Sequence, residues 1–233
     1  ARREPTFASS LFAARPAEFS IRTFIERYPQ ETYSRLVTWA GDESAHVRRL
    51  VSEGTRPRLP WAARLRAYQA DPSPVLALLE LLKDDSARYV QRSVANSLND
   101  IGKDHPELLV EVCERWLLDA PAPRRWIVNH ALRSLIKAGN AGALSLLGHG
   151  GRPELAIGNV GPEVKSVRTG TIFRFSCEVT NIGQDRQDLL IDFRVHFVKS
   201  NGKTSPKVFK LQKLSLLPRQ SAPLKGSVSF RDL

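Results

Sequence analysis

Apolar residues recur at helical spacing between Asp84 and Pro106. Spacings of four, four and three positions predict a helix that packs along one side. Its apolar stripe consists of Val90, Val94, Leu98 and Ile101. The polar face opposite consists of Arg92, Asn96, Asn99 and Lys103, with Asp100 at its edge. Cations and amides attract phosphates whereas a carboxylate repels them, so either Asp100 faces a cation or this helix presents a solvated surface of mixed charge.

The N-terminal part of the chain shows the same helical pattern throughout. Helices are expected over residues 17–28, 30–40, 42–53, 61–69, 74–83, 107–119 and 124–138. The first two would turn these side chains toward a core: Phe19, Phe24, Ile25, Leu36, Val37 and Trp39. Pro29 breaks the pattern, Pro57 and Pro60 stiffen a loop, and Gly139 is suited to end the last helix.

Two segments of this helical array repeat. Residues 47–51 match residues 90–94 at a spacing of 43, and residues 94–103 match residues 128–137 at a spacing of 34. Stacked helix pairs of about 35–45 residues are typical of HEAT-type solenoids, in which one helix of each pair lines a concave surface. The alignment makes Arg49, Arg92 and Trp126 equivalent. It also makes Glu53, Asn96 and His130 equivalent.

The periodicity becomes alternating after Gly148. Apolar residues then occupy every second position in three runs, which contain Phe173, Phe175, Cys177 and Val179, then Ile191, Phe193, Val195 and Phe197, then Phe209 and Leu211. Asn201-Gly202 between two such runs predicts a hairpin turn. The pattern indicates an immunoglobulin-like β-sandwich, which normally has about seven strands. We therefore expect a multidomain α plus β protein: a HEAT-like helical domain over 1–148, a linker over 149–160 and a sandwich over 161–233, with one or two further strands beyond residue 233.

Composition narrows the class of partner. The chain has 233 residues, 42% of them apolar, and a formal net charge of +11, which favours a polyanion as partner. Residues 151–233 hold 14 Lys and Arg against 7 Asp and Glu. Cys113 and Cys177 fall in different expected domains, so we expect no disulfide and a reducing, cytoplasmic location. No apolar run approaches about 18 residues, so no membrane segment is expected.

Basic residues follow the expected concave surface. Arginine forks bind phosphates and fix a nucleic-acid backbone without reading its bases. The residues expected to bind DNA there are Arg49, Arg56, Arg58, Arg92, Asn99, Lys103, Arg124, Arg125 and Arg133. Lys199 and Lys203 flank the predicted hairpin turn and are expected to reach a backbone as well. Two carboxylates, Glu53 and Asp100, lie among these cations.

Three ordered segments carry a family resemblance. They are VRRLVSEGTRPRLPWA at 47–62, SARYVQRSVANSLNDIGKDHP at 86–106 and RRWIVNHALRSLIKAG at 124–139. In these segments the chain resembles the bacterial DNA alkylation repair glycosylases of the AlkC/AlkD group, and its sandwich domain is similar to the AlkC branch. The resemblance implies monofunctional excision of cationic bases such as 3-methyladenine, and also 3-methylcytosine, from double-stranded DNA without extrusion of the base. We expect a monomer that needs no metal or other cofactor.

The resemblance also implies roles for single residues. Asp100 matches the catalytic aspartate of the family, and Glu53 would be a second catalytic carboxylate. AlkD has a tryptophan one turn before that aspartate, where this chain has Asn96, so that aromatic contact is not carried over. Trp61 and Trp126, together with Asn96, are expected to contact the lesion, with packing as the alternative role of each tryptophan.

The residue types fit this chemistry on their own. A base that carries a positive charge is a good leaving group, so the demanding step is the oxocarbenium character that develops in the sugar. A carboxylate stabilises that charge and positions the attacking water, and an aromatic face adds cation–π attraction of about 0.5–2 kcal/mol. His46 and His130 lack partners at metal-ligand spacing and are expected to be structural. The competing interpretation is a non-enzymatic HEAT scaffold that binds nucleic acid or protein.

Overall fold

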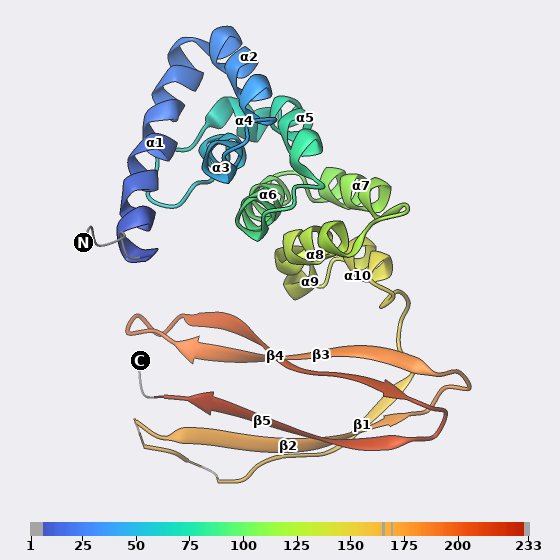
Figure 1. Ribbon diagram of the computed structural model, residues 1–233. Helices are drawn as coiled ribbons and strands as arrows, with labels where there is room; N and C mark the ends of the chain where they lie inside the picture. Colours follow the sequence, from blue (N-terminus) through green and yellow to red (C-terminus); the bar gives the residue numbers. More distant parts are fainter. Residues whose placement is uncertain (1–6, 165, 169, 231–233) are drawn as a thin grey trace, which may run out of the picture. The chain divides into compact units, whose positions relative to one another are not determined.

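The chain is divided into a helical unit and a β unit (Figure 1). The computed structural model describes residues 7–164, 166–168 and 170–230. The division falls between Ala143 and Leu144, close to the end expected for the helical domain. The fold class is α plus β, as the sequence predicts.

The helical unit is a succession of helices, most of them short. They are α1 (Phe7–Arg27), α2 (Pro29–Trp39), α3 (Ala45–Gly54), α4 (Arg66–Ala70), α5 (Ser73–Leu82), α6 (Arg88–Ile101), α7 (Pro106–Leu117), α8 (Ala122–Ala131) and α9 (Arg133–Ala138), with α10 (Ala141–Leu146) at the division. Pro29 and Pro106 begin α2 and α7, where a missing N–H costs no helical hydrogen bond. Among the described residues no helix is long and apolar enough to cross a lipid bilayer.

The central helix α6 lies between α3 and α8, the two helices that the sequence repeat aligns with it (Figure 1). Val90, Val94 and Leu98 are fully buried, as the apolar stripe predicts. The flanks are buried too, because α3 and α8 pack on separate sides of α6. The expectation of packing on one side only is therefore wrong. What remains open is a narrow strip that includes Arg92 and Asn96.

Asn99 departs from the polar face on which the sequence places it. The helix expected over 124–138 is broken at Leu132, between α8 and α9. The buried amide of Asn99 donates to the carbonyl of Ala131 at 2.7 Å and accepts from the hydroxyl of Ser134 at 3.1 Å. Asn99 thus fills the break and satisfies a carbonyl at the end of α8. Its buried side chain is therefore not available at the surface as the DNA-binding residue that the sequence predicts.

The first helices hold fewer core residues than expected. Ile25 and Leu36 are buried, as the pattern predicts. Phe24 is 53% exposed, and Phe19 and Val37 are exposed as well, so the core assignment of these three is wrong. Within the described residues α1 and α2 pack chiefly on each other and on α3.

The β unit has two antiparallel sheets. Its strands are β1 (Leu155–Pro162), β2 (Ile172–Asn181), β3 (Gln187–Val198), β4 (Thr204–Leu216) and β5 (Ser221–Ser229). One sheet has the order β1-β2-β5, and the other pairs β3 with β4. β1 begins inside the stretch expected as a linker. The core between the sheets centres on Val179, Leu189, Leu216 and Leu224.

The β3–β4 hairpin turns where the sequence predicts. The amide of Lys199 donates to the carbonyl of Lys203 at 2.9 Å, and the amide of Gly202 donates to the carbonyl of Lys199 at 2.9 Å. The φ of Gly202 is 74°, a left-handed conformation that glycine adopts without steric cost. The turn at Asn201-Gly202 is confirmed, and both flanking lysines are exposed.

Candidate active site

Two buried carboxylates of the helical unit meet at one arginine. Arg56 follows α3, and its guanidinium lies between Glu53 of α3 and Asp100 of α6. Its Nη1 is 2.6 Å from Glu53 Oε1, and its Nε is 2.8 Å from Asp100 Oδ2. Glu53 is 6% exposed and Asp100 is 1% exposed. The structure thus brings together the two carboxylates that the sequence names as catalytic.

This cluster continues at both ends into a chain of alternating charges. Lys103 Nζ is 2.7 Å from Asp100 Oδ1. At the other end Arg49 Nη2 is 3.6 Å from Glu53 Oε2, and Nη1 of the same arginine pairs with Glu18. We call the whole set the ion-pair chain: Glu18, Arg49, Glu53, Arg56, Asp100 and Lys103. It joins α1, α3 and α6.

Glu18 is a member that the sequence reasoning missed. It is buried and lies on α1, outside the segments that repeat, so no motif marks it. One signal was available. Glu18 and Arg22 are four residues apart and therefore share a helix face, and both turn out to be buried.

The carboxylates keep Arg56 charged in its buried setting. Burial alone would lower the pKa of Arg56, but Glu53 and Asp100 outweigh that effect and raise its pKa above the usual arginine value. The pKa of neighbouring Arg22 is lowered, chiefly by burial. The site therefore holds fixed charges in surroundings of low polarity, where they act more strongly on a developing charge than they would in water.

The loop after α3 presents Trp61 to the solvent. Arg22 donates to the carbonyls of Gly54 at 3.0 Å and Arg56 at 2.8 Å, and also to that of Ala63. Trp61 is 85% exposed, and its φ of 62° is a conformation that costs strain in a residue other than glycine. The bonds from Arg22 hold the loop that keeps the indole in this position.

A second ion pair ties the same loop to the segment after α6. Arg58 Nε is 2.8 Å from Asp104 Oδ2, and Gln69 Nε2 is 3.1 Å from the same oxygen. The bonds from Arg58 are the main cause that lowers the pKa of Asp104 from 3.8 to about 2. The loop that carries Trp61 is thus held by Arg22 on one side and by this pair on the other.

Asp104→Asn is expected to lower the free energy of unfolding at neutral pH by at most about 1 kcal/mol, because the pair is partly exposed. The folded-state pKa of Asp104 lies below its unfolded value of 3.8, so the stabilisation is complete well above that value and is lost as the pH falls toward about 2. The Tm values of the variant and the unaltered protein should differ at neutral pH and converge as the pH falls toward about 2. A difference of the same size at every pH would show that Asp104 acts without its charge.

Two other arginines expected to bind DNA are engaged inside the protein. Arg49 and Arg56 belong to the ion-pair chain, and Arg56 is buried. Their bonds hold carboxylates rather than phosphates. A helical pattern gives the direction of a side chain but not the acids that neighbouring helices bring to it, so the sequence could not separate these arginines from solvent-facing ones.

The remaining basic residues keep hydrogen-bond donors for a ligand. The exposed or half-buried ones are Arg58, Arg92, Lys103, Arg124, Arg125 and Arg133 in the helical unit, and Lys199 and Lys203 in the β unit. Arg124 Nε is 2.7 Å from Asp84, and Arg125 Nε is 2.8 Å from the carbonyl of Ala120. Because a guanidinium has five N–H donors, these bonds leave others available.

Trp126 is enclosed by neighbouring side chains. Its ring stacks on His130, with centroids 4.8 Å apart and planes at 12°. Arg88 Cζ lies 3.2 Å from the centroid of the indole. The faces of the indole are therefore occupied within the protein, which favours packing over contact with a lesion. Asn96 accepts a hydrogen bond from Arg133 at 3.0 Å and stays half-buried on the open strip of α6.

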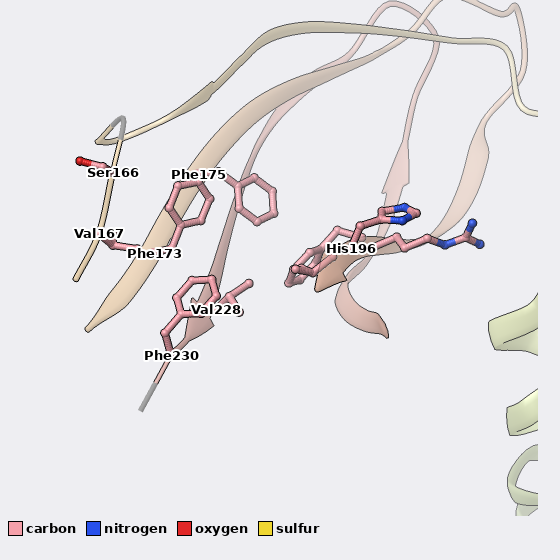
Figure 2. A pocket seen from close by; sticks show the side chains of 10 residues that line it. Ser166, Val167, Phe173, Phe175, His196, Val228 and Phe230 are labelled. Atoms are coloured by element: carbon pink, nitrogen blue, oxygen red, sulfur yellow. The ribbon is translucent and has the colours of Figure 1, made fainter. Parts of the chain in front are cut away.

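A cavity in the β unit lacks the charges of the ion-pair chain. It has a volume of about 480 Å³ and opens between the sheets, where Figure 2 shows Phe173, Phe175, Val228 and Phe230 around it. Its lining contains no carboxylate. Among the described residues there is also no group of three or more His, Cys, Asp or Glu side chains that could hold a metal ion. The carboxylates that converge on Arg56 in the helical unit are the candidate site.

Both units match known families. The family described as "DNA alkylation repair enzyme" matches residues 13–135. A second family, described as "Uncharacterised protein YhaZ, C-terminal Ig-like domain", matches residues 157–233. The first match covers more than half of the chain and includes every member of the ion-pair chain.

Longer proteins resemble the chain as a whole. "Uncharacterized protein YhaZ" of Bacillus subtilis (strain 168) is 37% identical over 218 residues, which cover 93% of this chain and 60% of that protein. A solved structure of Pseudomonas fluorescens alkylpurine DNA glycosylase AlkC, bound to DNA containing an abasic site analog, is 42% identical with a TM-score of 0.89. That match covers 93% of this chain and 60% of the AlkC chain, so the present chain spans about three fifths of the length of these relatives.

Proposed function

Because the chain belongs to the DNA alkylation repair enzyme family, we propose that it is a monofunctional DNA glycosylase that excises cationic N-alkylated bases. The expected lesions are 3-methyladenine and 3-methylcytosine in double-stranded DNA. The chemistry needs no metal or cofactor, since the base leaves with its positive charge neutralised. We propose that the protein acts as a monomer in the bacterial cytoplasm, where DNA is its substrate.

The observation that carries this proposal is the ion-pair chain. Three buried carboxylates, Glu18, Glu53 and Asp100, are held in place by the cations between them. Such an arrangement is costly to bury, because desolvation of the charges offsets much of their attraction. Its presence therefore favours a functional role over a purely stabilising one. Carboxylates that are already fixed in position stabilise a developing cation without further rearrangement.

We expect Asp100 to face the sugar. Its Oδ2 is fixed by Arg56, whereas its Oδ1 is held by Lys103, whose side chain is 43% exposed. Movement of Lys103 toward a phosphate would free Oδ1 for the oxocarbenium ion. Glu53 Oε2, which accepts from the hydroxyl of Ser93 at 2.8 Å, is the second carboxylate and orients the water.

Trp61→Ala is expected to weaken the preference for alkylated over undamaged duplex by roughly twofold to thirtyfold, the equivalent of one cation–π contact. Fluorescence polarisation with the two duplexes measures the preference. Trp61→Phe is the matched control and should retain part of it. An equal loss of affinity for both duplexes would show that the indole contacts DNA without recognising the lesion.

The β unit is proposed to add contacts to the DNA backbone. Lys199 and Lys203 are exposed at the β3–β4 turn, and residues 151–233 hold 14 Lys and Arg against 7 Asp and Glu. Lysine contacts with phosphates strengthen binding to any sequence and weaken with salt. Arg58, Arg124 and Arg125 are proposed to contribute in the same way from the helical unit.

The test of the function is the release of the base. A duplex that contains 3-methyladenine is incubated with excess protein, and free base is separated by chromatography. We expect 3-methyladenine in solution, an abasic strand, and no covalent adduct after borohydride treatment, since water and not an amine is the nucleophile. A duplex that is bound but keeps its base would overturn the proposal.

A binding scaffold without catalytic activity is the second candidate. The observation that favours it is the bonding of Asp100, whose two carboxylate oxygens already have partners inside the protein. In a scaffold the ion-pair chain would only fix α3 against α6. The two functions predict different effects of removing the Asp100 charge: a scaffold loses stability, whereas an enzyme loses rate.

A further inference from the structure

α6 and α8 run side by side in the same direction. Near the start of α6, Arg88 lies over the ring of Trp126 on α8, with its Cζ 3.2 Å from the ring centroid. Two helical turns further on, the side-chain oxygen of Asn96 accepts from Arg133 at 3.0 Å. Residues midway between these two contacts therefore face each other across the helix pair.

Arg92 and His130 are the residues midway between those contacts. His130 is half-buried against Trp126, whereas Arg92 is exposed and makes no ion pair or side-chain hydrogen bond with any described residue. The pKa of His130 is lowered, first by burial and then by Arg133, Arg92 and Arg88. The charged groups that act on His130 from α6 and from α9 are thus all cations.

We propose that His130 and these three arginines together bind one phosphate of the DNA backbone and that His130 takes up a proton from solvent as the phosphate binds. The set, which we call the basic cluster, consists of Arg88, Arg92, His130 and Arg133. Guanidinium and imidazolium groups donate charge-assisted hydrogen bonds to phosphate oxygens. The inference rests on the proposed function, because the ligand is the backbone of the same duplex.

Trp126 fixes the side chains of two members of the basic cluster, Arg88 and His130, in the DNA-free protein. A free arginine side chain loses rotamer entropy when a ligand fixes it, and affinity falls accordingly. The indole holds the guanidinium of Arg88 against its face by a cation–π contact, and it fixes the plane of the His130 ring by stacking. Trp126 then acts as a platform for phosphate binding rather than as a contact to the lesion.

The proton uptake has a defined direction. In the free protein, burial and the surrounding cations hold the pKa of His130 below its usual value of 6.5, so the ring is neutral at neutral pH. A bound phosphate adds a negative charge that favours the imidazolium form, and the pKa of His130 rises. DNA affinity therefore increases as the pH falls from about 8 to about 5.

Titration calorimetry of an undamaged duplex tests this linkage. Measured at one pH in two buffers with different ionisation enthalpies, binding should show uptake of up to about one proton. His130→Gln should abolish the uptake. The matched control is His46→Gln, since His46 is exposed and lies edge to face with the Tyr89 ring, away from the basic cluster in the sequence. The proton uptake of this variant should equal that of the unaltered protein. Arg92→Ala, at an exposed position, should lower the salt slope by about one unit for any duplex sequence.

The result that would overturn the basic cluster is proton uptake that His130→Gln leaves unchanged, or binding without any uptake. Different outcomes test the proposed function and the basic cluster. Base release without proton uptake would keep the glycosylase and remove the phosphate site. Uptake that depends on His130, on a duplex from which no alkylated base is ever released, would keep the phosphate site and remove the glycosylase.

Discussion

Asp100→Asn is expected to slow the release of an alkylated base by about a hundredfold to a thousandfold, while affinity for the duplex is kept or increases. Asparagine has the same shape and still accepts a hydrogen bond from Arg56, but it lacks the negative charge that faces the cationic sugar. The rate constant is measured with enzyme in excess over the duplex, so that one turnover is observed. Polarisation titrations with the same duplex give the affinity.

Asp85→Asn is the matched control for that experiment. Asp85 precedes the same helix and also pairs with an arginine, Arg48, but neither residue belongs to the ion-pair chain or to the loop that bears Trp61. Its variant should release the base at the rate of the unaltered protein. Glu53→Gln should act in the direction of Asp100→Asn with a smaller effect. A rate that Asp100→Asn leaves unchanged, together with a lower Tm, would assign the ion-pair chain to structure and favour the scaffold.

Arg56→Met is expected to lower the free energy of unfolding by about 3–5 kcal/mol, which is the usual effect of removing one partner from a buried ion pair. Methionine fills a similar volume, but Glu53 and Asp100 are then buried close together without the cation between them. Two carboxylates in that position repel each other, which destabilises the folded state. Urea denaturation at neutral pH measures the loss, and the loss should shrink as the pH falls.

A double variant separates charge from packing. Arg56→Met combined with Asp100→Asn leaves one buried carboxylate in place of two, so part of the lost stability should return. Arg56→Lys keeps a cation but lacks the planar fork that reaches both acids, and it should fall between the two extremes. If Arg56→Met were as stable as the unaltered protein, the ion-pair chain would contribute nothing to holding α3 against α6.

Helical spacing and the internal repeat predicted the frame of the site. Val90, Val94 and Leu98 recur at the period of a helix, and the repeat aligned α6 with α3 and α8, the two helices that lie beside it. What the period could not give was the number of neighbours around α6. Asn99 was assigned to a solvent-facing side for that reason, although a second helix covers it.

The resemblance named Asp100 and Glu53 as carboxylates of interest, but sequence alone could not show that they converge. Their convergence depends on Arg56, which charge alone had assigned to DNA. Glu18 was not predicted as a site residue, because its partner Arg49 is 31 residues away and local patterns carry no information at that distance. The start of β1 was assigned to the linker for a different reason. Most of the residues of β1 are exposed and Gly158 and Gly161 interrupt it, so no alternation of apolar and polar residues marks it as a strand.

The contacts of Arg22 also set the order in which the site forms during folding. Its three carbonyl partners lie 32, 34 and 41 residues further along the chain. Contacts at such separation form after local helices, since a long segment must be closed before any bond is gained. Until α1 docks, the loop that bears Trp61 is held only by the Arg58–Asp104 pair, and Arg49 lacks its partner Glu18. Local opening of α1 in the native protein therefore releases both, and hydrogen exchange should report the two as one cooperative unit.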